Sequence, residues 1–343
     1  MKNFVKGIIS VIVLSLTVSC TLYKEIPIEV LRPKTIHLPS GSDVTIIYRN
    51  FKYENDTLEH YYKDDYQLRA DRRNEGINID SIAVSGCLTS LVSNLERYAI
   101  FNNLTILPYQ TLPRIDGSHL SPLPSEVIRS MGTHTGSSYV ISLETLSYMY
   151  ASYSQGVAQE SSREIIMAGI WAVYDATSGI IKQHESVVDT LYWYKTDEAG
   201  IRIDLPPRVV ALELAGSVFG ENYAKKFVSD WETVQRILVI PPLQEFKTAA
   251  DHAFRDEWSQ AAAIWERYTA KRYGRLAVSA HYNMALASEL QDDIDNALRW
   301  MDQALELATN MRNKEDILMI LNYQKVLNLR KNEIGQFIKD GND

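Results

Sequence analysis

The sequence contains only two cysteines, Cys20 and Cys87, among its 343 residues. A framework of several disulfides is therefore excluded, and so is a metal site built from a cluster of thiolates. Stability must instead come from the burial of apolar side chains. A chain of this length with 45% hydrophobic residues can bury more than one core.

The sequence also lacks the short motifs of common enzyme classes. It has no HExxH, no GxSxG and no Walker loop, and its seven histidines are scattered along the chain. Catalytic groups can converge from distant positions without leaving such a motif. With 43 acidic residues, neighbouring carboxylates occur by chance. We predict that the protein is not an enzyme and that it binds no metal and no cofactor.

A surplus of basic residues is missing as well. Lysine and arginine together number 35 against 43 aspartates and glutamates, which gives a formal net charge of -8. Proteins that bind nucleic acid carry a basic face or stripe that contacts the phosphates. The sequence therefore predicts no nucleic-acid partner.

The apolar stretch near the N-terminus is too short to cross a membrane. It runs over 13 residues from Gly7 to Ser19, whereas a spanning helix needs roughly 20. Lys2 and Lys6 precede it, and smaller residues lie just before Cys20. This order of basic, apolar and small residues is typical of a secretory signal peptide.

The end of this stretch resembles the bacterial lipobox, including the relaxed form ending in Ser-Cys among Bacteroidota lipoproteins. Thr17 stands where the core motif has leucine. The resemblance implies that residues 1–19 are removed and that a covalent lipid on Cys20 anchors the protein to a membrane of the cell envelope. An ordinary signal peptide with an incidental cysteine is the alternative. Because CTLYKEI lacks an acidic run after Cys20, we expect an outer-membrane protein facing the periplasm.

A composition shift at Pro241 and Pro242 divides the remaining chain. Before it, β-rich runs alternate with helical stretches, and after it the chain is rich in Ala, Glu, Leu and Arg. We predict an anchor and leading strands at 20–42, an α/β domain at 43–240 and an all-α domain at 241–338.

The α/β domain is predicted to hold a mixed sheet with helices on one or both faces. Its clearest element is a hairpin of two long strands at 163–175 and 180–194, joined through the turn sequence DATSG. The stretch THTGSSYVISLETL and this hairpin resemble the periplasmic α/β domain of bacterial lipoproteins such as curli-secretion pore subunits and outer-membrane activators of penicillin-binding proteins. The likeness covers about residues 40–195.

Two aromatic clusters end long strands of this domain. One contains Tyr148, Tyr150 and Tyr153, and the other contains Tyr192, Trp193 and Tyr194. Packing across strands explains such clusters, because alternate residues share one face. Exposed tyrosine and tryptophan also form surfaces that bind proteins or glycans. The clusters are therefore a candidate partner or carbohydrate surface, and carbohydrate binding or processing is the alternative function.

The all-α domain resembles tetratricopeptide repeats. The stretch NMALASELQDDIDNALRWMDQALEL carries small residues where paired helices approach closely, and AADHAFRDEWSQAAAIWERYTAKR repeats the scheme 36 residues earlier. The residues that define the two repeats are Ala249, Ala261, Trp265, Ala285, Ala297 and Ala304. A capping helix follows from 313 to 329. The alternative is a helical bundle of another kind.

Two repeats and a cap are fewer than the three or so repeats that usually bury a continuous core. We therefore expect another part of the chain to cover the first repeat. The nearest candidate is the predicted helix at 207–228, together with WETVQRILVI behind it.

Taken together, the signal, the α/β domain and the paired repeats resemble an uncharacterised Bacteroidota lipoprotein family, which has no assigned activity or ligand. We predict a non-enzymatic lipoprotein of the cell envelope whose repeats bind another protein.

Overall fold

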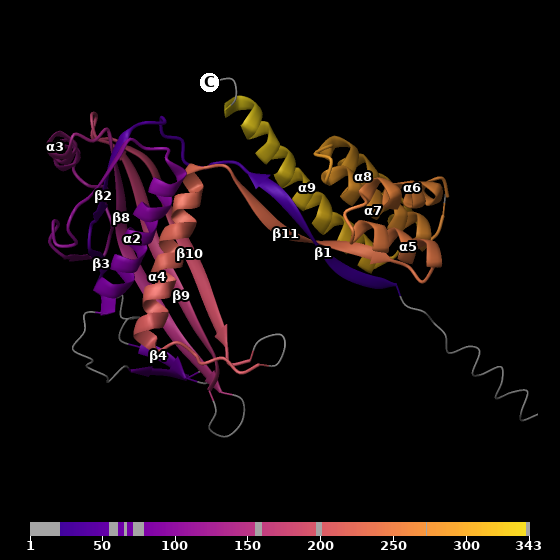
Figure 1. The fold of residues 1–343 in the computed structure, drawn as a ribbon, viewed down its shortest axis with the longest axis horizontal. Coiled ribbons are helices and arrows are strands. Elements are labelled where there is room, and N and C mark those ends of the chain that lie inside the picture. The colour runs from indigo at the N-terminus through magenta and orange to yellow at the C-terminus, as the bar shows by residue number, and fades with distance from the viewer. Residues whose placement is uncertain are drawn as a thin grey trace, which may run out of the picture. The chain divides into compact units, whose positions relative to one another are not determined.

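The computed structural model describes residues 21–54, 61–64, 67–70, 79–154, 160–196, 201–271 and 273–340. Their contacts separate two compact units, whose elements are drawn in Figure 1. The α/β unit comprises Lys34–Ser229, and the helical unit combines the residues up to Pro33 with those from Asp230 onward. The predicted signal peptide and Cys20 lie outside the described residues.

A mixed sheet forms the centre of the α/β unit, as predicted. Its main strands lie in the order β10-β9-β8-β2-β6. Strand β2 runs parallel to β6 and β8, whereas β8, β9 and β10 form an antiparallel meander. The bounds are β2 Asp43–Tyr48, β6 Asn103–Ile106, β8 Tyr139–Ser154, β9 Glu160–Asp175 and β10 Ile181–Tyr194.

Four short strands complete the unit. β4 (Tyr61–Asp64) pairs with β8 and with β5 (Gln67–Ala70), and β3 (Phe51–Tyr53) pairs with β7 (Ile115–Gly117). The predicted hairpin between β9 and β10 is confirmed. Gly179 adopts a positive φ of 73° in the turn, and the Asp175 carboxylate accepts hydrogen bonds from the next backbone amides at Thr177 and Ser178.

Helices α2 (Ile79–Tyr98) and α4 (Arg208–Ala224) lie side by side on one face of this sheet (Figure 1). They approach closely because Gly216 and Gly220 face the α2 backbone. A Cβ at Gly220 would lie 2.0 Å from the Cys87 carbonyl oxygen, so no larger residue fits there. A short 3-10 turn, Lys225–Phe227, follows α4. On the other face, α3 (Ser125–Thr135) buries Ile128 in a smaller core.

The expectation that the helix at 207–228 and WETVQRILVI cover the first repeat is half right: WETVQRILVI packs against the C-terminal helices, but the helix at 207–228 does not. The buried side chains of α4, including Phe219 and Tyr223, belong to the core of the α/β unit. Tyr223 stacks on Trp171 of β9 with ring centroids 4.1 Å apart and an interplanar angle of 7°. The apolar face of α4 is therefore occupied by its own sheet.

The C-terminal region is helical, as predicted. Its helices are α5 Gln244–Ala253, α6 Trp258–Thr269, α7 Arg275–Glu289, α8 Ile294–Asn310 and α9 Lys314–Asp340. Each packs on the next one in the chain. All six side chains that define the predicted repeats are fully buried in one core, namely Ala249, Ala261, Trp265, Ala285, Ala297 and Ala304.

A two-stranded antiparallel ribbon completes the helical unit. β1 (Leu22–Arg32) pairs with β11 (Asp230–Ile240) along its whole length, from Leu22 opposite Ile240 to Arg32 opposite Asp230. Its side chains Ile26, Ile28, Val30 and Leu238 share the core of the helices. We call this pair of strands the ribbon.

The helices also bind the backbone of the ribbon. The Asn283 side chain on α7 donates to the Val239 carbonyl oxygen over 2.8 Å and accepts from the Val239 amide over 3.1 Å. Arg330 on α9 donates to the Leu31 carbonyl oxygen. Satisfied buried backbone groups of this kind tie the ribbon to the helices.

The division of the chain therefore differs from the predicted boundaries at 42 and 240. β11 precedes the proline pair but belongs with the helices, because its apolar residues Leu238 and Ile240 are buried there. β1 belongs there too. The α/β unit is thus inserted between the two strands of a hairpin.

This insertion predicts that the α/β unit can be excised. A chain in which Arg32 is joined to Asp230 through Asn-Gly keeps the whole ribbon, and the turn sequence suits a two-residue hairpin connection. We expect this chain to melt cooperatively in circular dichroism. Residues 241–343 alone lose the ribbon's core side chains and should melt without a cooperative transition. A cooperative melt of that shorter piece would contradict the account.

Candidate functional site

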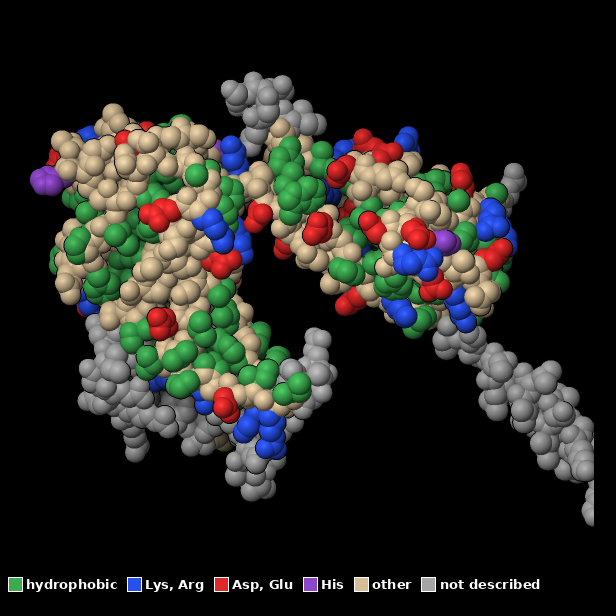
Figure 2. Space-filling view, in the orientation of Figure 1, with side chains coloured by type: hydrophobic (Ala, Val, Ile, Leu, Met, Phe, Trp, Pro, Cys, Tyr) green, Lys and Arg blue, Asp and Glu red, His purple; other side chains and the backbone are tan. Residues whose placement is uncertain are grey.

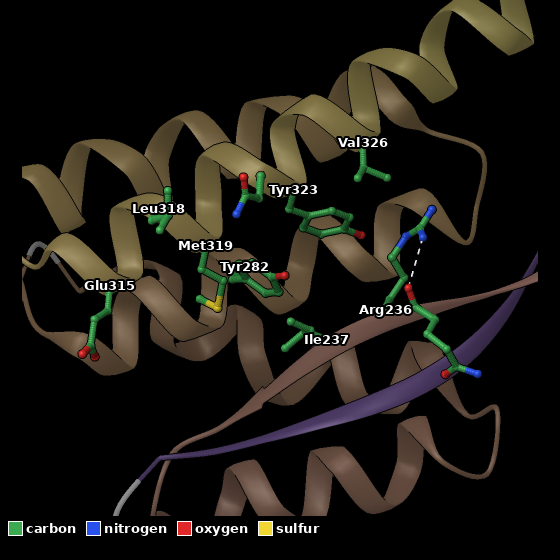
Figure 3. A pocket seen from close by; sticks show the side chains of 10 residues that line it. Arg236, Ile237, Tyr282, Glu315, Leu318, Met319, Tyr323 and Val326 are labelled. Carbon is green, nitrogen blue, oxygen red and sulfur yellow. Dashed lines mark hydrogen bonds between the residues drawn. The ribbon is translucent and has the colours of Figure 1, made fainter. Parts of the chain in front are cut away.

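The helical unit contains an open groove with a volume of about 460 Å³. Its walls come from β11, α7 and α9, as Figure 3 shows. The apolar lining consists of Ile237 on the ribbon with Leu318, Met319 and Val326 on α9. Leu318 is 62% exposed and Ile237 is 39% exposed. Side chains that are this apolar and this exposed in a concave site are typical of a binding surface.

The ends of the groove are polar. Glu315 lies at one end and Arg236 at the other (Figure 3). Gln235 and Asn322 supply two further side chains with hydrogen-bonding capacity. An apolar centre between polar ends suits a segment that presents a row of apolar side chains flanked by polar ones.

A buried ion pair lies at the Arg236 end of the groove. The Arg236 guanidinium contacts the Glu289 carboxylate of α7 through Nη2 to Oε1 at 2.7 Å and Nε to Oε2 at 2.9 Å. Only 11% of the Arg236 side chain and 1% of the Glu289 side chain are exposed. Tyr323 on α9 donates its hydroxyl to Glu289 Oε2 over 2.6 Å. One carboxylate thus joins the ribbon, α7 and α9.

The pKa shifts of Arg236 and Tyr323 favour the protonation states in which both donate hydrogen bonds to Glu289. Burial by itself would lower the pKa of Arg236, but the hydrogen bonds and charge of Glu289 outweigh it and raise that pKa above its ordinary value. Burial, followed by the neighbouring Glu289 charge, raises the pKa of Tyr323 well above that of a free tyrosine. Arg236 therefore stays charged and the phenol stays a donor.

The predicted aromatic surface is only partly found. Tyr148 and Tyr150 are 4% and 8% exposed and lie in the core beneath α4, so their assignment to a surface is wrong. Their face of β8 is the one that the helices cover. Trp193 is half-buried and packs against the same core. Tyr192 and Tyr194 point to the other face, are 55% and 63% exposed, and stack with centroids 6.5 Å apart.

The residues that define the repeats do not line the groove. All six are core side chains, and they set the spacing of the helices whose edges form the groove. The lining residues themselves were not singled out from the sequence. One signal was present, because Arg236 alternates with Val234 and Leu238 on the apolar face of a strand. A cation in that position needs a buried partner.

A second buried ion pair lies in the α/β unit. Arg49 Nη1 contacts Glu144 Oε2 at 2.5 Å, and the Tyr174 hydroxyl donates to Glu144 Oε1 over 3.0 Å. Leu123 donates its amide to the Tyr174 oxygen over 3.1 Å, and Arg49 also donates to the Ser121 carbonyl oxygen. These contacts join the loop around 121–123 to the sheet, so we assign the pair a structural role.

Other chemistry is sparse in the described part of the chain. No group of three or more His, Cys, Asp or Glu side chains in it is arranged to hold a metal ion. Burial raises the pKa of the Cys87 thiol, which disfavours a reactive thiolate. None of the described helices has both the length and the apolar composition needed to cross a bilayer. Charges of both signs are interspersed on the face of the helical unit seen in Figure 2.

Fold and site together define a two-unit chain in which a mixed α/β unit interrupts a grooved helical unit. The chain belongs to the family described as a domain of unknown function, DUF8603, whose model matches residues 42–238 and thus more than half of the sequence. A second model described as a domain of unknown function, DUF6340, matches residues 247–329. Membership of an uncharacterised family is confirmed at this level. No curated protein matches the chain.

Several solved structures are similar to the chain at low identity. A PelC dodecamer from Paraburkholderia phytofirmans is 12% identical, covers 60% of this chain and 99% of that chain, and has a TM-score of 0.25. A putative neuraminyllactose-binding hemagglutinin homolog from Helicobacter pylori is 9% identical, with coverages of 55% and 86% and a TM-score of 0.27. The rare lipoprotein B from Shewanella oneidensis is 11% identical, with coverages of 53% and 89% and a TM-score of 0.22. Identities this low assign no function to this chain.

The buried carboxylate yields a stability prediction. Glu289→Gln leaves the Arg236 charge buried without its counter-ion, which costs on the order of 3 kcal/mol of unfolding free energy. Urea unfolding followed by circular dichroism measures this loss. The double variant Arg236→Met, Glu289→Leu removes both charges and should recover most of it. A Glu289→Gln variant that unfolds at the wild-type urea concentration would show that the pair does not brace the site.

Proposed function

We propose that this protein is a lipoprotein of the cell envelope, anchored through Cys20, that acts as a non-enzymatic protein-interaction module. Its helical unit binds an extended or helical segment of a partner protein in the groove between β11, α7 and α9. The anchor is proposed to lie in the outer membrane with the protein on the periplasmic side. The observation that carries the binding role is the open apolar groove, with a buried ion pair at its Arg236 end.

The groove suits a peptide better than a small polar metabolite. Leu318, Met319 and Val326 offer apolar contacts on the first half of α9, and Ile237 offers one on the ribbon. A preorganised binding surface loses little conformational entropy when its ligand binds. The ion pair of Arg236 and Glu289 makes the groove rigid in this way. Helix-in-groove recognition uses a row of apolar anchors spaced to match such a wall.

The repeated turns of the helical unit support a tetratricopeptide-like arrangement. Asp256 and Asp292 occupy equivalent turns 36 residues apart, and both adopt positive φ, 61° and 54°. The amide after each turn donates five residues back, from Glu257 to His252 and from Asp293 to Ser288. A third turn of the same kind, at Arg312, joins α8 to α9, so consecutive helices are connected through one recurring local geometry. Stacked hairpins of this kind leave a concave side for a ligand.

The anchor is tested by metabolic labelling with a fatty acid. We expect the label on the wild-type protein and its loss in Cys20→Ala, which should also accumulate with its N-terminal 19 residues uncut, because the thiol is the proposed acceptor of the lipid. A Cys87→Ala variant is the matched control, since Cys87 is buried and should leave the label unchanged. Fatty-acid label retained by the Cys20→Ala variant would refute the lipoprotein assignment.

The groove is tested by photocrosslinking in living cells. A benzoylphenylalanine at Leu318 places the probe in the groove, whereas one at Leu329 places it at a position on α9, 55% exposed, that does not line the groove. We expect one discrete protein adduct from position 318 and none from 329. The adduct should be lost when Met319→Asp puts a charge in the apolar wall.

A third probe position separates the alternative function. A probe at Tyr194 samples the exposed stacked rings of β10. Equal adducts from 318 and 329 would refute specific use of the groove. A specific adduct from position 194 alone, whether the crosslinked partner is a protein or a glycan, would instead favour the exposed tyrosines of β10 as the binding surface.

A further inference from the structure

The start of β1 leaves almost no linker after the proposed anchor. Cys20 lies outside the described residues, and only Thr21 separates it from Leu22, the first residue of β1. Consecutive Cα atoms are 3.8 Å apart, so the Cα atoms of Cys20 and Leu22 are at most about 7.6 Å apart. A lipid on Cys20 would therefore bring this end of the ribbon to the surface of the bilayer.

This end of the ribbon is surrounded by exposed apolar and aromatic side chains. Leu22 is 49% exposed, Tyr23 44%, Phe254 45% and Tyr273 74%. We call these four residues the rim. They come from β1, from the end of α5 and from the loop before α7. Exposed large apolar side chains that gather at one place mark an interaction surface.

Contacts of β1 reach the other two elements that carry the rim. The Lys24 ammonium lies 5.5 Å from the centroid of the Phe254 ring. Arg275, two residues after Tyr273, donates to the Tyr23 hydroxyl over 3.3 Å and also contacts Asp316 on α9 at 3.2 Å. These contacts place Phe254 beside Lys24 and Tyr23 beside Arg275, so β1, the end of α5 and the start of α7 meet at this end of the ribbon.

We propose that the rim seats the helical unit on the phospholipid bilayer that holds the acyl chains of Cys20, an inference that rests on the anchor of the proposed function. Tyrosine and other aromatic side chains favour the region of the lipid headgroups, where an apolar ring and a polar edge are both satisfied. Lys24 and Arg275 lie beside the rings, in reach of lipid phosphates.

The proposed contact between the rim and the bilayer does not depend on anionic lipid. Glu25, Arg255 and Asp256 are all exposed next to the rim, so charges of both signs lie around it. The acyl anchor supplies the affinity, and the rim orients the unit.

The contact of the rim with the bilayer can be tested without relying on acylation in the cell. The mature chain, residues 20–343, is coupled through Cys20 to a maleimide-headgroup lipid in vesicles of phosphatidylethanolamine and phosphatidylglycerol. Cys87 is fully buried and stays unmodified. The reference is the same chain coupled to a water-soluble maleimide. Hydroxyl-radical oxidation followed by mass spectrometry then measures the exposure of each aromatic side chain.

We expect Tyr23, Phe254 and Tyr273 to be oxidised several-fold more slowly on vesicles than in the reference. Trp231, 62% exposed, lies at the other end of the ribbon opposite Leu31, about 30 Å along the strand. Its rate should not change. Phe254 and Tyr273 oxidised at the reference rate would overturn the proposal. Because the coupling is chemical, this result is independent of the fatty-acid label, so the two proposals fail separately.

Discussion

The pairing of β1 with β11 is the interaction on which the rest of the structure depends. It joins residues about two hundred positions apart in the sequence, from Arg32 opposite Asp230 to Leu22 opposite Ile240. Closing so long a loop costs conformational entropy, although the cost grows only slowly with length. Two 11-residue strands and the burial of Ile26, Ile28 and Val30 among the helices offset that cost.

Several features of the protein follow from this ribbon. It closes the core of a helical array that is too short to close its own, and its β11 strand supplies one wall of the groove through Ile237. It lets the α/β unit occupy the loop of a hairpin, so that each unit keeps its own core. It also places the proposed anchor at the edge of the helical unit, since β1 begins two residues after Cys20.

Local patterns in the sequence predicted most of the elements, because periodicity and turn chemistry are local. The hairpin of β9 and β10 and the alanines of the helical hairpins are examples. The ribbon was not predicted, since nothing local to WETVQRILVI says which strand it pairs with. The tyrosines show the same limit: alternation placed Tyr148 with Tyr150 on one face, but only the position of α4 decides that this face is buried. Arg236 and Glu289 meet only because two distant elements do.

Amide hydrogen exchange resolved along β1 tests the central claim most directly. If the ribbon is part of the helical unit, the backbone amides of Leu22–Arg32 that bond to β11 exchange as slowly as those of α7, because the same cooperative unfolding must expose both. That is the result we predict for the intact protein. Exchange of these amides at the rate of an unstructured peptide, while α7 stays protected, would contradict the account and reduce β1 to a tether.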